Sequence, residues 1–180
     1  FNIYTLDILA DGKLHVSLES DFPEYEIRYT TDGTEPNAQS AIFKRPIIVE
    51  KDINLKARHF KNGRANGNTL SKDYKYHLAL GKKVKLKAEP SEHYNTGGAQ
   101  TLVNGIVGSL PWSGNEWLGW RGQEMEVVID LGKYQDISRV QISFLQAKES
   151  WIHLPVKVKV MVKDFGNIYR EVDLNVNKWI

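Results

Sequence analysis

Cysteine is absent from this chain of 180 residues, and its absence excludes several kinds of chemistry at once. Disulfide bonds, thiol nucleophiles and thiolate metal sites all require cysteine. A chain without cysteine fits a reducing cytosol and equally fits an envelope protein that needs no cross-link, so the compartment stays open. Histidine is sparse as well, and the five positions show no spacing typical of a metal site: His15, His59, His77, His93 and His153.

Long apolar runs and a strong net charge are also lacking. No stretch approaches the roughly 20 apolar residues that a helix needs to span a membrane. The 24 basic residues nearly balance the 22 acidic ones, which leaves a net charge of +2, and the basic residues alternate with apolar ones instead of clustering. Nucleic-acid-binding domains usually show a basic patch or stripe. The sequence therefore predicts neither a membrane span nor a nucleic acid partner.

Recognisable catalytic motifs are missing too. The chain has no nucleophile elbow, no His-Glu-x-x-His motif and no glycine-rich phosphate loop. Asp32 and Glu35 have the chemistry of an acid/base pair, but a turn explains both residues. Glu124 and Glu126 point to the same face of a strand, whereas the carboxylates of a glycosidase must flank the bond that breaks. We expect no catalytic residues and no enzymatic activity on this chain.

The first part of the chain shows the alternation of polar and apolar residues that a half-buried strand requires. Asp32-Gly33 and Asn62-Gly63 supply positive φ at little cost, so they mark tight turns. No helical periodicity is convincing. The expected strands cover residues 13–19, 25–30, 47–49, 54–60 and 69–77, with Pro46 at a sheet edge. This pattern predicts a small antiparallel β-sandwich of immunoglobulin or fibronectin type over residues 1–78.

A second strand-rich segment follows a natural break at Gly81. We predict a linker over residues 79–82 and a second domain over residues 83–180. Turn-rich loops separate its strand patterns, which is typical of another antiparallel sandwich. The expected strands cover residues 126–131, 140–145, 156–162 and 169–176. The fold class predicted for the whole chain is all-β, with two sandwiches in tandem.

Three tryptophans, Trp112, Trp117 and Trp120, fall within nine residues of one glycine-rich loop. Indole rings on a loop either fill the core beneath it or present a flat apolar face to a ligand. Sugar sites combine such a face with a few planar hydrogen-bonding groups, so the loop indicates carbohydrate binding. The candidate aromatic platforms are Tyr94, Trp112, Trp117, Trp120 and Trp151, and the candidate polar partners are Glu92, His93, Asn115, Glu116, Arg121 and Gln123. The alternative to a ligand platform is a ring packed in the core. For Trp117 the two orientations are equally favoured, and for Trp151 the packed ring is favoured.

The first segment carries a resemblance to a known family. Residues 27–36, which contain Tyr29-Thr30-Thr31-Asp32-Gly33-Thr34-Glu35-Pro36, and then residues 53–60 resemble the small sandwich that follows the catalytic barrel of bacterial chitobiases, which are β-N-acetylhexosaminidases. The residues themselves also predict a strand that leads into an Asp-Gly turn, followed by a proline that ends ladder pairing. This prediction agrees with the resemblance.

The second segment resembles a discoidin-like module, also called a coagulation factor V/VIII type C domain, of the kind that bacterial glycosidases use to bind sugars. The matching features occur in the family's order: Ala88-Glu89-Pro90, Tyr94, Gly97-Gly98, residues 102–105, the tryptophan loop, residues 128–132, 137–140 and 144–146, Trp151-Ile152 and Pro155. Together the two segments resemble the C-terminal tail of family 20 β-hexosaminidases over nearly all of the chain.

Two departures from the family pattern matter. Such modules usually run to about 130–150 residues, so the jelly roll is expected to be incomplete, and the start at Phe1 without methionine suggests a piece of a longer protein. The family more often has Asp-Gly where this chain has Asn104-Gly105, and that aspartate is commonly a calcium ligand. Asn104 and Ser109 offer only neutral oxygens, so we expect no cofactor beyond a weakly bound calcium ion; the alternative is an Asn-Gly turn with no ion.

The resemblance implies a non-catalytic accessory region in bacterial glycan degradation. It would target a parent β-N-acetylhexosaminidase to glycans that contain N-acetylglucosamine or galactose. Its partners would be that glycan and the parent's catalytic domain, and its place would be the bacterial periplasm, the outer membrane or the extracellular space. The alternative is a structural tail that packs on the catalytic barrel or mediates protein contacts and binds no sugar.

Overall fold

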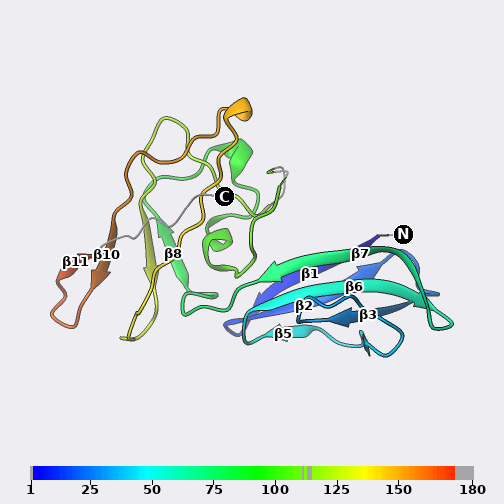
Figure 1. The fold of residues 1–180 in the computed structure, drawn as a ribbon. Helices are drawn as coiled ribbons and strands as arrows, with labels where there is room; N and C mark the ends of the chain where they lie inside the picture. The colour runs from blue at the N-terminus through cyan, green and yellow to red at the C-terminus, as the bar shows by residue number, and fades with distance from the viewer. Residues whose placement is uncertain (1, 111, 113–114, 173–180) are drawn as a thin grey trace. The chain divides into compact units, whose positions relative to one another are not determined.

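The computed structural model of the protein describes residues 2–110, 112 and 115–172. They fall into two compact units, one ending at Asp130 and the other beginning at Leu131. Figure 1 labels most of the strands described below. Apart from three short 3-10 helices the regular structure of the described residues is all strand, which confirms the predicted all-β fold class.

The first unit begins with seven antiparallel strands in two sheets, whose orders are β1-β2-β5 and β4-β3-β6-β7. This arrangement is a sandwich of the predicted immunoglobulin or fibronectin type. Strands β2, β3, β5 and β6 lie where the alternation predicts them, and β1 and β4 are additional. The bounds are β1 Ile3–Ala10, β2 Lys13–Ser20, β3 Glu26–Thr30, β4 Ala41–Ile42, β5 Ile47–Val49, β6 Ile53–Lys61 and β7 Arg64–Tyr74.

Tight turns join two of these strand pairs. Asn62 and Gly63 have φ values of 52° and 72° and form the two-residue connection between β6 and β7, in which Lys61 pairs with Arg64. Two positive φ angles in succession match the right-handed twist of the strands, which is why Asn-Gly is favoured there. The turn predicted at this dipeptide is therefore confirmed, and it places the start of β7 five residues earlier than the sequence pattern suggests.

The core of the sandwich lies between the two sheets. Leu14, Val16 and Leu18 alternate along β2 and are at most 4% exposed, and Leu55 and Ala57 on β6 are fully buried. Burying one large aliphatic side chain contributes about 1.5–3 kcal/mol to the free energy of unfolding. These two central strands thus account for much of the hydrophobic stabilisation of the sandwich.

The Asp32–Pro36 stretch has a structural explanation. The Asp32 carboxylate accepts hydrogen bonds from the Thr34 backbone N–H at 3.0 Å and the Thr34 hydroxyl at 2.6 Å. The Thr34 hydroxyl is the main reason why the pKa of Asp32 lies below its usual value. Glu35 accepts hydrogen bonds from Lys56 on β6 and Thr69 on β7. Both carboxylates therefore hold the turn and its neighbouring strands together.

The chain leaves the sandwich through a segment that is hydrogen-bonded to later residues. Lys75 N–H donates to Gly105 O at 2.7 Å, and Gly81 N–H donates to Val103 O at 3.0 Å. Leu80 is 3% exposed and belongs to the sandwich core. The linker predicted at residues 79–82, with domain bounds 1–78 and 83–180, stays a prediction; the segment itself lies inside the first compact unit.

The remaining regular structure of the first unit is small. Strand β8, Lys83–Leu86, pairs with β9, Val127–Asp130, in an antiparallel sheet. Two 3-10 helices, Glu92–Tyr94 and Ala99–Val103, lie between them in the sequence. Strand β9 lies within the range 126–131 predicted from the alternation.

The second unit departs from the sequence-based predictions. Its strands β10, Val160–Lys163, and β11, Tyr169–Val172, form a hairpin, and residues 173–176 of the last predicted strand lie outside the described residues. The strand predicted at residues 140–145 is wrong, because those residues have no ladder partner within the described part of the chain. The prediction that the Trp151 ring is packed is also wrong, because the residue is 86% exposed. Trp151 directly follows the 3-10 helix Lys148–Ser150 and has a φ of 58°.

A search of the described residues finds no helix that is long and apolar enough to cross a membrane.

One buried histidine links the two sheets. His59 on β6 is 0% exposed, and its Nε2 atom lies 2.7 Å from the Ser20 hydroxyl at the end of β2. The rings of Phe22 and Tyr25 pack against it edge to face, at centroid distances of 6.1 and 5.8 Å. Burial lowers the pKa of His59 below its usual 6.5, because the charged imidazolium loses its hydration.

We predict that the free energy of unfolding falls as the pH drops below about 6.5. The unfolded chain binds the proton at a higher pH than the folded one, so the stabilisation is complete above the unfolded pKa and is lost as the pH falls toward the folded pKa. Urea unfolding at several pH values measures this. His59→Gln should flatten the dependence at the cost of overall stability, and an unchanged slope in that variant would contradict the assignment.

Candidate functional site

Most of the candidate binding residues lie on the loops around residues 91–95 and 109–121, and the described residues of these loops form one connected structure in the first unit. Ser91 N–H donates to Gly119 O at 2.8 Å, and Gly119 N–H donates to Tyr94 O at 3.1 Å. A Cβ atom at Gly119 would lie 3.1 Å from Cγ of Tyr94, a tight contact, so a larger residue there would press on the Tyr94 side chain. The two loops are therefore fixed to each other by backbone contacts.

The structure brings two of the predicted aromatic residues together. The rings of Tyr94 and Trp112 meet edge to face, with centroids 5.8 Å apart and an interplanar angle of 63°. Both residues are half-buried. An edge-to-face pair contributes about 0.5–1.5 kcal/mol beyond its buried area, so each ring restrains the other. Part of this aromatic pair remains accessible to a ligand.

The other two tryptophans are held by their indole nitrogens. Trp117 donates from Nε1 to Ser109 O at 3.0 Å, and its ring lies so close to Gly108 that a Cβ atom there would be 2.5 Å from the ring. Trp120 donates from Nε1 to Ala88 O at 2.8 Å. A half-buried indole whose only polar group is engaged with the backbone is suited to holding a loop in place.

Three of the predicted polar partners are open to solvent. His93, Asn115 and Arg121 are all exposed. None of the three side chains makes a hydrogen bond or an ion pair within the described residues. The structure does not show them converging on one point, so their binding role stays a prediction.

The predicted calcium loop is built as a turn. Asn104 Oδ1 accepts a hydrogen bond from the Ile106 backbone N–H at 2.9 Å, and Gly105 has a φ of 76°. A Cβ atom at Gly105 would lie 2.6 Å from Lys75 O, so the position requires glycine. Ser109 contributes its carbonyl oxygen to Trp117, as described above. Among the described residues, no group of three or more His, Asp or Glu side chains is arranged to hold a metal.

A polar cavity of about 770 Å³ lies next to this turn, within the first unit. Two oxygen atoms that line it, Thr101 Oγ1 and Glu116 Oε2, are buried without a hydrogen-bond partner among the described residues. On its other side the cavity is lined by Asp7 and Lys72, which form an ion pair at 2.7 Å. The sequence pattern gave no signal for this cavity, because its walls come from strands and loops that are distant in the chain.

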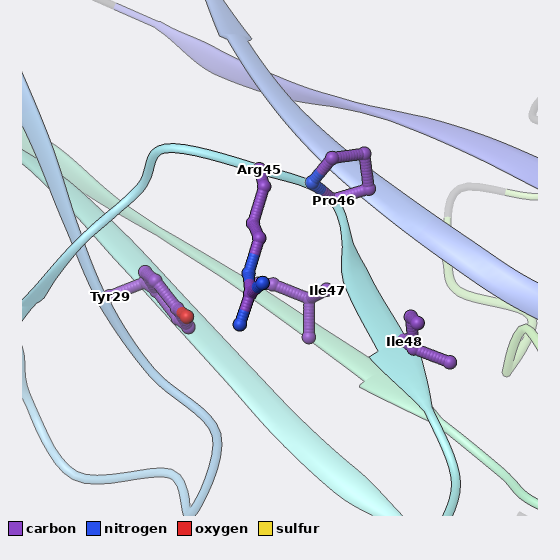
Figure 2. Close-up of a pocket in the computed structure, with 5 residues that line it drawn as sticks. All are labelled: Tyr29, Arg45, Pro46, Ile47 and Ile48. Atoms are coloured by element: carbon purple, nitrogen blue, oxygen red, sulfur yellow. The ribbon is translucent and has the colours of Figure 1, made fainter.

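A second cavity, of about 370 Å³, lies at the edge of the sandwich. Tyr29 on β3 forms one wall, and Arg45 to Ile48 form the other where the chain crosses from β4 in one sheet to β5 in the other. Figure 2 shows the guanidinium group of Arg45 between the ring of Tyr29 and the side chain of Ile47. The sequence analysis missed these residues, because a single arginine before an edge strand is an ordinary surface pattern.

Comparison with known proteins finds two partial matches. Residues 16–74 match a family model described as Fn3 associated, and this range runs from within β2 to the end of β7. A stretch of 64 residues is 33% identical to a putative beta-glucuronidase from Formosa agariphila. That match covers 34% of this chain and 6% of the relative, so the chain spans only a small part of that protein's length.

Alanine variants of Trp117 and Trp112 test whether the Trp117 ring stabilises the fold more than the partly accessible Trp112 ring does. Trp117→Ala should lower the free energy of unfolding by about 2–3 kcal/mol, somewhat less than a fully buried tryptophan, because it removes a ring packed on backbone together with a hydrogen bond. Trp112→Ala should cost about 1 kcal/mol, the value of one aromatic pair. Urea unfolding of both variants measures the difference. Equal losses, or a larger loss for Trp112→Ala, would contradict these roles.

Proposed function

We propose that the chain is a non-catalytic accessory region of a glycoside hydrolase and that it binds carbohydrate through the loops at residues 91–95 and 109–121. The match to the Fn3-associated family and the relative named a putative beta-glucuronidase support the first part. The observation that carries the second part is the half-buried Tyr94 and Trp112 pair, held on loops that are bonded to each other.

The physical chemistry of sugars fits this arrangement. A pyranose ring offers an apolar C–H face that packs on an aromatic ring, and its hydroxyl groups need planar hydrogen-bonding partners at the edge. Exposed side chains of the predicted kind, Asn115, His93 and Arg121, are available on the same loops. Because a small sugar gains little buried area and must order its hydroxyl groups, we expect a dissociation constant of about 0.1–1 mM, or roughly 4–5.5 kcal/mol.

The identity of the parent enzyme is a finer part of the proposal. The resemblance of residues 27–36 and of the tryptophan loop suggests a bacterial family 20 β-N-acetylhexosaminidase with a discoidin-like second module. The name of the relative suggests a parent that acts on glucuronides. In both cases the region would work outside the cytoplasm, in the periplasm, at the outer membrane or outside the cell, where it would bring the catalytic domain to its glycan.

A structural tail is the second candidate function, and one observation favours it. The outer face of the sheet β1-β2-β5 carries an apolar row, in which Tyr4, Leu6 and Ile8 on β1 are 45–48% exposed. Ile8 pairs with His15, which in turn pairs with Ile48, so the row continues across the sheet to another residue that is 45% exposed. Such a face can pack on a catalytic domain without any sugar.

Calcium at the Asn104–Ser109 loop belongs to the same proposal, and we predict that it binds weakly. The Asn104 side-chain oxygen already accepts the Ile106 N–H, and neutral oxygens compensate poorly for the dehydration of the ion. Dialysis against a chelator should therefore leave the melting temperature nearly unchanged. Elemental analysis that finds one tightly held metal per chain after dialysis would show that the loop is a true metal site.

A sugar titration tests the proposed binding directly. Wild-type protein should bind a ligand on an array or in calorimetry that contains N-acetylglucosamine, galactose or glucuronic acid. Trp112→Ala should weaken that binding by about 1–3 kcal/mol, because a stacking ring is lost while the fold persists. Trp151→Ala is the matched control, since Trp151 is 86% exposed and lies outside the loops. If no sugar binds to wild-type protein, the structural-tail function replaces this one.

A further inference from the structure

We propose that the cavity formed by Tyr29 and Arg45 binds a sugar that carries a carboxylate, such as a uronic acid. This inference rests on the proposed function for the class of ligand, but it concerns a different site, on the sandwich and distant in sequence from the tryptophan loop. It follows from the chemistry of the cavity walls, which combine an accessible cation, an aromatic ring and an apolar side chain.

Arg45 is the feature that defines the ligand's charge. Its side chain is exposed and makes no hydrogen bond or ion pair within the described residues. Two other arginines of the sandwich have partners: Arg28 binds Glu26 at 2.9 Å, and Arg58 donates to Gly67 O at 3.0 Å. The guanidinium group of Arg45 instead projects into the cavity beside Tyr29 (Figure 2). Its five N–H donors are left for an external acceptor.

The backbone holds Arg45 in a restricted conformation. Pro46 follows it, and a residue before proline is confined to extended backbone angles. The next strand, β5, is fixed by its antiparallel register with β2, in which Ile47 pairs with Val16. The backbone of Arg45 is therefore already restrained at the cavity rim, and only its side chain loses conformational entropy when a ligand binds.

The other walls form a rigid platform. Tyr29 and Ile47 both pack against the hydrophobic core, and Phe43 meets the Tyr29 ring edge to face at 6.3 Å. The Tyr29 hydroxyl has no hydrogen-bond partner among the described residues. A sugar ring could place its C–H face on this platform and use the hydroxyl for one of its polar groups.

Charge and size then select the ligand. No acidic residue lines the cavity. A guanidinium group binds a carboxylate through two parallel, charge-assisted hydrogen bonds, which a neutral sugar cannot accept equally well. The volume of about 370 Å³ is at the lower end of the range for small-molecule pockets and suits a single sugar ring.

Calorimetric or NMR titration with methyl β-D-glucuronide and methyl β-D-glucoside, at one fixed salt concentration, tests the site. Wild-type protein should bind the glucuronide at least about tenfold more tightly than the glucoside. Arg45→Gln should remove that preference, and it should leave the free energy of unfolding unchanged because the side chain is exposed and unpaired. Lys44→Gln is the matched control, since it removes the same charge one residue away and should change binding by less than about twofold.

The outcomes distinguish this site from the tryptophan loop. Loss of glucuronide preference in Arg45→Gln, with no effect of Trp112→Ala on glucuronide binding, supports the site. Glucuronide binding that falls in Trp112→Ala but not in Arg45→Gln overturns it and leaves the proposed function standing. Equal losses in Arg45→Gln and Lys44→Gln mean non-specific attraction and also overturn it. If the glucuronide does not bind but a neutral sugar does, the acidic-sugar site is wrong and the accessory binding function is kept.

Discussion

The contact of the half-buried Asp7 and Lys72 with the fully buried Tyr74 is the polar interaction that ties the two sheets of the sandwich together. The Asp7 carboxylate on β1 accepts hydrogen bonds from the Tyr74 hydroxyl and from Lys72 Nζ on β7, each at 2.7 Å, so it connects the two sheets. Tyr74 is 0% exposed, and burial together with the neighbouring carboxylate raises its pKa well above the usual value. Removing one partner leaves a partly buried polar group without its hydrogen bond, which typically costs about 1–3 kcal/mol.

The same cluster sets the position of the loops that follow. Tyr74 is the last residue of β7, and the next residue, Lys75, donates its N–H to Gly105 O. Gly105 lies shortly before the tryptophan loop in the sequence. A backbone hydrogen bond from Gly119 N–H to Tyr94 O joins that loop to the 3-10 helix Glu92–Tyr94. A rigid sandwich that supports aromatic loops is the common design of a binding module, in which the scaffold provides order and the loops provide recognition.

The sequence was informative where local chemistry decides the structure. Asn62-Gly63 specified a two-residue turn, and the alternation around Val16 and Leu55 specified the core strands, because both signals need only neighbouring residues. It was uninformative where partners are distant. The alternation at residues 140–145 has no ladder partner in the described structure, and the cavity of Tyr29 and Arg45 forms only when two sheets meet. The aromatic pair lies between these cases: the sequence singled out Tyr94 and Trp112 as candidates, but their contact was not predictable.

The central claim is that this region binds carbohydrate without cleaving it. The most direct measurement is an NMR titration of the isotope-labelled chain with sugars containing N-acetylglucosamine, galactose or glucuronic acid. The claim predicts that the indole N–H signal of Trp112 and backbone signals near Tyr94 move with increasing sugar, that the indole signal of Trp151 stays still, and that the sugar remains intact. Signals that do not move up to tens of millimolar sugar, about ten times the weakest dissociation constant expected, would contradict the claim.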